Sequence, residues 1–362
     1  MNELFRADYR DLRVYGGDSK GFAVDLSDNT NQWGTPPAAE RALRAAAESM
    51  LRGYPQPYGE SLKEVLAAHV GVSPEWIVTG TGSDDILDCG FRALATPGAR
   101  VAYQSPTFVM VPTFARTNGL EPVAVPLTSG YDADVDAMLA VGARITYLCT
   151  PNNPTATPLS RAAIEAVVDR AKGFVVIDEA YVDFADDDFA DLVKRSPRVL
   201  VARTFSKAFG LAGIRVGYGI ASPELITEIE KARGPYKLTA VSERAACAAL
   251  SEDPGWVREK ATLAIAAREW LRGELQARGI DTPPSQANFV FVPIANAQAI
   301  AAHMANAGVA VRAFARLPLI DARLIATNGD ALRITVGPEP MMRAMLEAFD
   351  AAVAALATSE AR

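Results

Sequence analysis

The sequence contains few of the residues that enzymes most often use to bind metals or to activate nucleophiles. Its 362 residues include only two histidines and three cysteines, Cys89, Cys149 and Cys247, which lie far apart. Neither a zinc-ligand spacing nor a disulfide framework can be drawn from this set. We therefore expect no metal site, and we expect the cysteines to be small buried residues. His69 and His303 both fall on helical patterns, which favours histidines on helix surfaces.

Long apolar runs and basic patches are missing as well. No apolar stretch reaches the roughly 18 residues that a membrane helix needs. The polar, acidic start MNELFRADYRDLR does not resemble a secretory signal. The formal net charge is −7, and no basic run offers a footprint for nucleic acid. We therefore expect a cytoplasmic protein that binds neither membranes nor nucleic acid.

Between about residues 30 and 240 the chain alternates short β-branched runs with alanine-rich helical stretches. Runs such as RVAYQ (100–104), GFVVIDEA (173–180) and RVLVART (198–204) are apolar on both faces, as buried parallel strands are. Helical patterns, for example at 83–94, lie between several of these runs. This alternation predicts an α/β fold with a mostly parallel central sheet flanked by helices.

After residue 240 the pattern changes to longer helices and fewer strands. A helical stretch from 240 to about 278 contains a break at EDPGW, and a final helix begins at 338. ANFVFVPI and ALRITVG are predicted strands between these helices, which indicates a smaller α+β unit. The predicted domains are an N-terminal arm (1–28), a large domain (29–240) and a small C-terminal domain (241–362).

Residues whose side chains can bind ligands or take part in catalysis gather where the predicted strands end. In an open α/β sheet, the ligand crevice lies beyond the carboxyl ends of the strands. VTGTGSDDIL (78–87) fits a strand, a glycine turn and a helix start, whose free backbone N–H groups can bind a phosphate. The same segment also fits a helix that Ser83 or Asp84 caps. A dinucleotide fingerprint would need Gly or Ala at position 85, and Asp85 there disfavours a nicotinamide cofactor.

Two further strand ends carry a stiff loop and a buried acid. In LCTPNNPT (148–155), two prolines stiffen a loop that presents Asn152 and Asn153, or they only form a rigid turn. In VVIDEAYVDF, Asp178 ends a buried strand, where a carboxylate is costly unless it meets a cation. That cation is either the partner in a core salt bridge or the protonated ring nitrogen of a ligand, which Tyr181 would also reach.

RTFSKAFGLAGIR (203–215) places a lysine after the next strand, among apolar and small residues. Thr204 and Ser206 lie beside Lys207, and Arg215 follows past a glycine-rich turn. Pyridoxal phosphate needs a lysine for a Schiff base, an acid against its pyridine nitrogen and donors for its phosphate. Desolvation beside other cations lowers the pKa of a lysine and makes the amine nucleophilic near neutral pH. Taken together, these strand ends predict a pyridoxal phosphate site, with Arg215 on the phosphate.

The chain resembles the fold-type-I, pyridoxal-phosphate-dependent aminotransferases, and most closely the histidinol-phosphate aminotransferase group. The motifs that carry the resemblance are GTGSDD, SPTF, TPNNPT, IDEAYVDF, RTFSKAFGLAGIRVGY, ANFVFV and LRITVG, in the family's order. They extend from about residue 25 to 337, nearly the whole chain. The resemblance implies an aspartate aminotransferase-like fold and transfer of an amino group to 2-oxoglutarate by a ping-pong mechanism.

The resemblance also implies a role for each residue that matches a motif. Lys207 matches the Schiff-base lysine and general base, and Asp178 matches the acid that keeps the pyridine nitrogen protonated. Tyr181 and Asn153 match the residues that hydrogen-bond the cofactor's phenolic oxygen. Phe108 matches the aromatic residue that stacks on the pyridine ring. The residues that match the group around the phosphate are Gly82, Ser83, Asp84, Thr204, Ser206 and Arg215.

Further matches imply a shared active site and the contacts to the substrate. Tyr54, in RGYPQPYG, matches a tyrosine that reaches the cofactor phosphate of the partner subunit, which implies a homodimer. Arg333, in LRITVG, matches the arginine that grips the acidic group of the substrate. Asn29 and Tyr15 are the other candidates for binding the substrate.

The sequence departs from the family's pattern at several positions. Thr30 stands where a glutamate is usual, and Ala156 stands where a glycine follows NNPT. Phe108 replaces the common tyrosine, and Lys237 replaces the asparagine of many members. Thr30 and Lys237 are expected near the substrate, so the amino donor stays open between histidinol phosphate and an aromatic amino acid. The alternatives are a decarboxylase of the threonine-phosphate type, a non-catalytic cofactor-binding module and a nicotinamide dehydrogenase.

Overall fold

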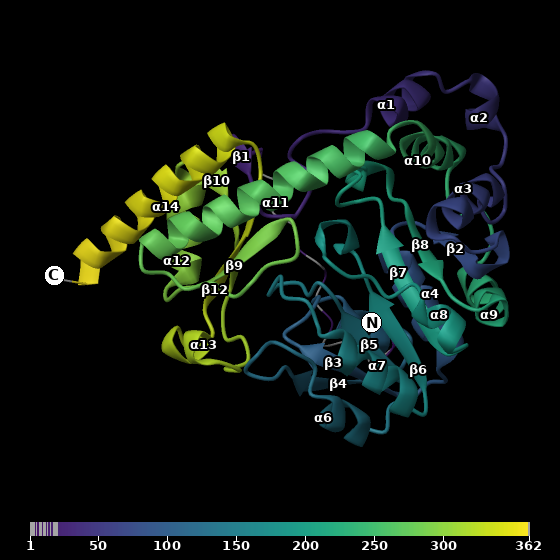
Figure 1. Ribbon diagram of the computed structural model, residues 1–362, viewed down its shortest axis with the longest axis horizontal. Helices are drawn as coiled ribbons and strands as arrows, with labels where there is room; N and C mark the ends of the chain where they lie inside the picture. Colours follow the sequence, from purple (N-terminus) through teal and green to yellow (C-terminus); the bar gives the residue numbers. More distant parts are fainter. Residues whose placement is uncertain are drawn as a thin grey trace.

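The computed structural model describes residues 4, 6, 9, 12, 14, 16 and 21–360 (Figure 1). Tyr15, one of the predicted substrate-binding residues, lies outside the described residues. Within them, a seven-stranded sheet has the order β2-β8-β7-β6-β5-β3-β4. Its strands are β2 (Ile77–Gly80), β3 (Arg100–Ser105), β4 (Glu121–Pro126), β5 (Ile145–Cys149), β6 (Phe174–Asp178), β7 (Val199–Thr204) and β8 (Gly217–Ile220).

The seven-stranded sheet is mostly parallel. Strands β3 to β7 pair in parallel, whereas β8 runs antiparallel to both β7 and β2. Every residue of β5 and β7 is buried, as the apolar runs predict for strands covered on both faces. The predicted α/β fold with a mostly parallel central sheet is therefore confirmed.

Helices cover both faces of this sheet. Successive residues of β6, Val176 and Ile177, belong to two different buried clusters, because neighbouring side chains of a strand point to opposite faces. Helix α4 contributes Ile86 and Phe91 to the cluster around Val176, and α7 contributes Ile164 to the other. The helices here are α4 (Ser83–Leu94), α5 (Val111–Thr117), α6 (Val135–Ala140), α7 (Arg161–Arg170), α8 (Leu192–Arg195) and α9 (Pro223–Arg233).

The sequence pattern locates the parallel strands better than it locates the shorter helices and turns. The predicted strand at 75–79 begins with a 3₁₀ turn (Pro74–Trp76), and β2 follows at Ile77. The pattern does not predict α1 (Pro37–Arg44), α2 (Glu48–Arg52), α8 or α9. Helix α3 (Glu60–Val70) carries His69 on its surface, as expected. Further 3₁₀ turns follow Tyr181 (Val182–Phe184) and Leu211 (Ala212–Ile214).

The C-terminal part is built on a three-stranded antiparallel sheet with the order β11-β12-β9. The predicted break at EDPGW is confirmed, because Asp253 separates α10 from α11, and Pro254 is the first residue of α11. Figure 1 shows α11 running from the side of α1 and α10 to the side of β9. The elements are α10 (Ala240–Glu252), α11 (Pro254–Ala277), β9 (Phe289–Pro293), α12 (Ala297–Asn306), β10 (Val309–Ala310), β11 (Arg312–Phe314), α13 (Ala322–Ala326), β12 (Ala331–Thr335) and α14 (Glu339–Glu360).

A short strand near the N-terminus joins this C-terminal part. Strand β1 (Val24–Asp25) pairs in parallel with β10. The chain then passes Leu26, which accepts a hydrogen bond from the Thr335 N–H of β12, and turns towards the large sheet at Asn29. Residues 26–30 therefore bridge β12 and the carboxyl ends of the parallel strands. The division of the chain at residues 28 and 240 stays a prediction.

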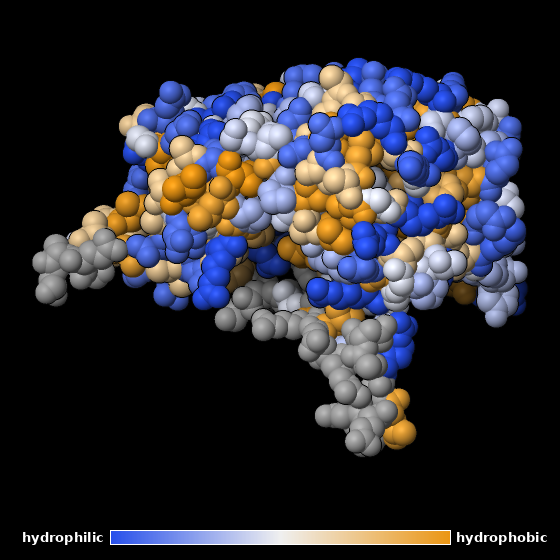
Figure 2. Space-filling view, turned by 90° about the horizontal axis from the view of Figure 1, so that it is seen from below, coloured by the Kyte–Doolittle hydropathy of each residue, from blue (hydrophilic) through white to orange (hydrophobic). Residues whose placement is uncertain are grey.

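The surface of the molecule carries both hydrophilic and hydrophobic residues. Figure 2 shows hydrophilic residues interspersed with hydrophobic ones over the face seen from below. No helix among the described residues is both long enough and apolar enough to cross a membrane.

Candidate active site

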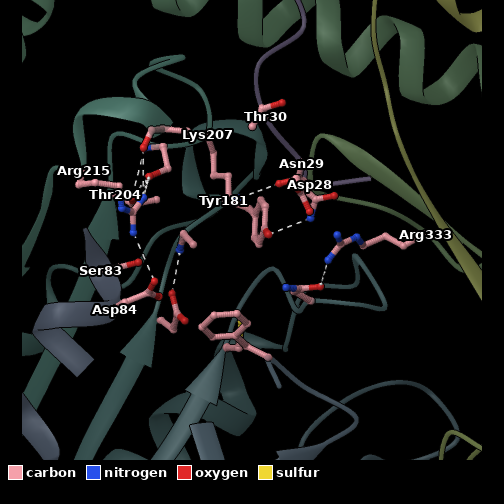
Figure 3. Close-up of a pocket in the computed structure, with 17 residues that line it drawn as sticks. Asp28, Asn29, Thr30, Ser83, Asp84, Tyr181, Thr204, Lys207, Arg215 and Arg333 are labelled. Atoms are coloured by element: carbon pink, nitrogen blue, oxygen red, sulfur yellow. Dashed lines mark hydrogen bonds and ion pairs between the residues drawn. The ribbon is translucent and has the colours of Figure 1, made fainter. Parts of the chain in front are cut away.

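A cavity of about 300 Å³ lies at the carboxyl ends of β5, β6 and β7 (Figure 3). Arg215, Thr204, Ser83 and Asp84 lie on one side of it, and Arg333 and Asn29 lie on the other. Most of the residues predicted for the site line this cavity, although they come from seven separate segments. They are Asn29, Ser83, Asp84, Phe108, Asn153, Asp178, Tyr181, Thr204, Ser206, Lys207, Arg215 and Arg333.

Lys207 follows β7 and projects into the cavity as a partly buried amine. Its Nζ donates a hydrogen bond to the backbone oxygen of Asp28 at 3.1 Å and lies 5.7 Å from the centre of the Tyr181 ring. Burial, helped by the positive charge of Arg333, lowers the pKa of Lys207 to about 8. This direction agrees with the prediction from the sequence. Near pH 8 about half of the amines are therefore neutral and nucleophilic.

Asp178 ends β6 and lies buried at the base of the cavity. One carboxylate oxygen accepts a hydrogen bond from the Tyr147 hydroxyl at 2.7 Å, and the other accepts one from the Ala180 N–H at 3.1 Å. Burial raises the pKa of Asp178 to about 6, and these two hydrogen bonds oppose the rise. Among residues 21–360 no lysine or arginine forms an ion pair with this carboxylate. The alternative of a core salt bridge at Asp178 is therefore wrong.

The N-terminus of α4 forms one end of the cavity. Gly82 is the N-cap residue, with a φ of 81°, and no side chain caps the helix, so the alternative that Ser83 or Asp84 caps it is wrong. A Cβ atom at Gly82 would come within 2.7 Å of Arg215 Nη2, so the guanidinium lies directly against the glycine turn. The first N–H groups of α4 remain available to an anion.

Arg215 lies beside the hydroxyl groups of Ser206 and Thr204 at the same end of the cavity. Its Nη1 lies 3.3 Å from Ser206 Oγ, and Thr204 Oγ1 donates to Ser206 Oγ at 3.0 Å. Its Nη2 lies 3.3 Å from Asp84 Oδ2, and burial raises the pKa of that carboxyl although Arg215 opposes the rise. An uncapped helix, an arginine and two hydroxyls make this end suited to a phosphate.

Arg333 of β12 occupies the opposite end. Its Nη1 donates a hydrogen bond to Asn153 Oδ1 at 2.7 Å, and its Nη2 donates to the backbone oxygen of Ser27. The guanidinium carbon lies 5.5 Å from the centre of the Phe289 ring. These contacts hold a largely buried arginine at the cavity wall, where a planar guanidinium can bind a carboxylate or a phosphate.

Asn29 and Tyr181 meet between these two ends. Asn29 Nδ2 donates a hydrogen bond to Tyr181 Oη at 2.9 Å. Tyr181 packs edge-to-face on Phe289, with ring centres 5.1 Å apart. Burial raises the pKa of Tyr181 well above its usual value, so its hydroxyl stays protonated in the working range of pH. The sequence analysis assigns no role to Tyr147, which bonds Asp178, or to Thr335, which lies in LRITVG and bonds Asn29. Each has the appearance of an ordinary strand residue.

Of three other predicted residues, one lines the cavity and two do not. Thr30 lines the cavity, as expected. Lys237 does not line it: its Nζ pairs with Asp85 Oδ1 at 3.0 Å, so the expectation that Lys237 lies near the substrate is not met. Tyr54 is 87% exposed and is not among the residues that line the cavity. Its ring packs against that of Tyr236, with the ring centres 5.0 Å apart. Its contribution to a partner subunit stays a prediction.

Comparisons with known proteins agree with this arrangement. Residues 23–349 match the model of the family described as aminotransferase class I and II. The aromatic amino acid aminotransferase of Mycolicibacterium vanbaalenii is 37% identical over 325 residues, which cover 87% of this chain and 92% of that protein. Histidinol-phosphate aminotransferase 2 of Caulobacter vibrioides is 36% identical over 338 residues, which cover 91% of this chain and 86% of that protein.

Solved structures give the same answer for the fold. The crystal structure of histidinol-phosphate aminotransferase from Sinorhizobium meliloti in complex with pyridoxal 5'-phosphate has a TM-score of 0.86 and 27% sequence identity, and the match covers 98% of each chain. The predicted resemblance is thus confirmed over nearly the whole sequence. Since the matched residues include every element that borders the cavity, this chain belongs to the class I and II aminotransferases.

Proposed function

We propose that this aminotransferase moves an amino group from histidinol phosphate or an aromatic amino acid to 2-oxoglutarate in two half-reactions. Its cofactor is pyridoxal phosphate, as it is for the Sinorhizobium meliloti enzyme. The observation that carries the proposal is one cavity that holds a lysine of lowered pKa and a buried carboxylate without an ion-pair partner among the described residues.

The residues present fit pyridoxal phosphate at three points. Asp178 offers a buried carboxylate to the pyridine nitrogen, and the uncapped start of α4 with Arg215 offers donors to the phosphate. Lys207 offers the amine for the covalent bond. When bound, pyridoxal phosphate supplies an aldehyde carbon and an electron-withdrawing ring that takes up the electron pair left when the donor loses its α-proton.

Lys207 is the proton carrier of the proposed mechanism. Its free Nζ would accept the proton from the α-carbon of the donor and would hold that proton for return to the reacting atoms. A pKa near 8 suits this exchange, because the amine is neither fully protonated nor too weak a base near neutral pH. The Asp28 backbone oxygen, which accepts a hydrogen bond from this amine, holds it against the cavity wall.

Asp178 would hold the pyridine nitrogen of pyridoxal phosphate and would stabilise the protonated form of that nitrogen. Its two hydrogen bonds, from Tyr147 and Ala180, fix the carboxylate and favour its ionised form. Tyr181 and Asn153 are proposed to bond the phenolic oxygen, and Phe108 is proposed to pack against the ring.

Arg333 selects the substrates in both half-reactions. Asn153 and Ser27 hold its guanidinium at the cavity wall, where it binds an acidic group of each substrate in turn. 2-Oxoglutarate, histidinol phosphate and the aromatic amino acids each carry an acidic group, and relatives of similar identity are named for both classes of donor.

A donor screen tests the proposed function. Purified protein loaded with pyridoxal phosphate is incubated with 2-oxoglutarate and either histidinol phosphate, phenylalanine, tyrosine or tryptophan, and glutamate is measured. Initial rates at several concentrations of both substrates should give parallel double-reciprocal lines. Release of carbon dioxide from threonine phosphate without glutamate formation would support the decarboxylase alternative and contradict the proposal.

We also propose that the enzyme is a homodimer in which Tyr54 reaches the cofactor phosphate of the partner subunit. The support is the strong exposure of Tyr54 and of Leu51, which leaves two large hydrophobic side chains of neighbouring sequence uncovered in a single chain. The cytoplasmic location stays a prediction from the sequence.

A further inference from the structure

Asn29 joins β12 to Tyr181 through a short network of buried hydrogen bonds. Its N–H donates to Thr335 Oγ1 at 3.0 Å, and Thr335 Oγ1 donates to Asn29 Oδ1 at 3.1 Å. Asn288 Nδ2 donates to the Asn29 backbone oxygen at 3.0 Å. Asn29 Nδ2 is then free to donate to Tyr181 Oη, at 2.9 Å. Both ends of the Asn29 amide are thus hydrogen-bonded, the nitrogen to Tyr181 Oη and the oxygen to Thr335 Oγ1.

The backbone of Asn29 adopts an unusual conformation at this point. Its φ is 57°, in the left-handed region, and the residue is 1% exposed. Asparagine tolerates this region better than most residues, but a buried position of this kind persists only where the surroundings hold it. The bonds from Thr335 and Asn288 supply that support. The chain therefore holds Asn29 in a specific geometry beside the cavity.

The direction of the bond between Asn29 and Tyr181 determines what the tyrosine can do. Because the amide N–H donates, Tyr181 Oη is the acceptor in this bond and keeps its own proton for another partner. Among the described residues this proton has no acceptor, and Tyr181 lines the cavity. The hydroxyl proton is therefore available to a ligand in the cavity.

We propose that Asn29 is a positioning residue that makes Tyr181 a hydrogen-bond donor to the phenolic oxygen of pyridoxal phosphate. This inference rests on the proposed function, which gives Tyr181 that contact. A phenol that accepts a hydrogen bond at its oxygen becomes a stronger donor, so Asn29 both orients and strengthens the bond from Tyr181. Such a bond favours the ionised phenolic oxygen. Asn29 would therefore favour the deprotonated form of the bound cofactor and lower the midpoint of the holoenzyme's pH titration.

Charged groups from several elements also act on this pH, and they are the same in every variant proposed below. They are Arg333 from β12, Lys207 and Arg215 from the segments after β7, Asp178 from β6, Asp84 from α4 and Asp28 from the N-terminal segment. Because these groups are unchanged, the comparison of Asn29→Ala with and without Tyr181→Phe reports the part of the shift that passes through Tyr181.

The test is a pH titration of the absorbance of the holoenzyme, which needs no turnover. Asn29→Ala should raise the midpoint of this titration, the pH at which half of the absorbance change has occurred, by roughly 0.5 to 1 pH unit. This shift corresponds to one ordinary hydrogen bond. Tyr181→Phe should raise it at least as much, and Asn29→Ala added to Tyr181→Phe should cause no further rise. Thr335→Val, which keeps Asn29 but removes the hydroxyl that orients its amide, should give a smaller shift in the same direction.

Asn31→Ala is the matched control. Asn31 lies in the same segment and donates a hydrogen bond from Nδ2 to the Ala208 oxygen at 2.8 Å, without contact to Tyr181. Its removal loosens the segment to a similar degree and should leave the midpoint at the wild-type value. An equal shift in Asn31→Ala would mean that general loosening is responsible, and it would overturn the inference.

The other outcomes separate this inference from the proposed function. If Tyr181→Phe shifts the midpoint and Asn29→Ala and Thr335→Val do not, the inference fails and the role of Tyr181 stands. If Asn29→Ala shifts the midpoint equally with and without Tyr181→Phe, the effect does not pass through Tyr181, and the inference again fails. If Tyr181→Phe causes no shift, the proposed contact of Tyr181 and the role of Asn29 both fail.

Discussion

Replacing Tyr147 by phenylalanine should change the acid side of the pH profile while leaving the cavity intact. The Tyr147 hydroxyl lies on β5, fully buried, and donates to Asp178 at 2.7 Å. A hydrogen bond to a charged group contributes roughly 1.5 to 3 kcal/mol, and about 1.4 kcal/mol corresponds to one pKa unit. Part of the bond survives to the protonated carboxyl, so we expect the loss of this bond to raise the pKa of Asp178 by about one unit.

The sign follows from the role of the carboxylate. Burial already raises the pKa of Asp178, and the bond from Tyr147 opposes that rise, so its loss raises the pKa further. A protonated Asp178 no longer favours the positive pyridine nitrogen. The acid limb of kcat/KM should therefore move up by about one pH unit, while the rate near pH 8.5 changes little. The affinity for pyridoxal phosphate should weaken on the acid side only.

The assay compares pH profiles of kcat/KM for the wild type, Tyr147→Phe and Tyr103→Phe. Tyr103 lies beside Tyr147 on the neighbouring strand β3, and its hydroxyl does not bond Asp178, so it controls for the loss of a tyrosine hydroxyl from this sheet. An acid limb that stays in place in folded, cofactor-loaded Tyr147→Phe would refute the reasoning. So would an equal displacement in Tyr103→Phe.

Three further outcomes are expected. Lys207→Ala should lower turnover at least about a thousandfold. It should also abolish the covalent attachment of the cofactor that borohydride reduction leaves on the wild-type protein, and attachment to another lysine in the wild type would contradict the assignment. Tyr54→Phe should raise the dissociation constant of pyridoxal phosphate roughly five- to tenfold, and an unchanged constant would remove the shared-site proposal. Ala156→Gly should change the free energy of unfolding by less than about 1 kcal/mol, because relief at a φ of 64° offsets the lost burial of a methyl group and the added chain entropy. A denaturant titration that shows a larger loss would contradict this balance.

The parts of the site that the sequence predicts well are local. Gly82 and the start of α4 follow directly from a strand, a glycine turn and a helix pattern within ten residues. Asp178 and Lys207 each come at the end of an apolar run, and the register of β6 and β7 brings those ends together. A parallel sheet gathers its carboxyl ends at one edge, so motifs that are far apart in sequence meet without further information.

The parts that the sequence predicts poorly depend on contacts between distant segments. Strands β1 and β10 are two residues long each, so their pairing has no periodic pattern to reveal it. Helices α1 and α2 are short, and an eight-residue helix depends more on its packing, here against α10, than on its own propensity. Lys237 replaces the asparagine of many family members, which predicts a place near the substrate, but its side chain pairs with Asp85 and does not line the cavity.

The residues that the motifs predict are mostly the groups that react, whereas residues from distant segments set the protonation of those groups. Lys207, Asp178 and Tyr181 lie in recognisable motifs, whereas the residues that bond them are Asp28, Tyr147 and Asn29, from other segments. Asn29 in turn depends on Thr335, which is 306 residues away in the chain. Relatives that share the reactive motifs can therefore differ in the pH at which they work. The residues to compare among them are the bonding partners at these positions, because a change there alters a pKa without altering the chemistry.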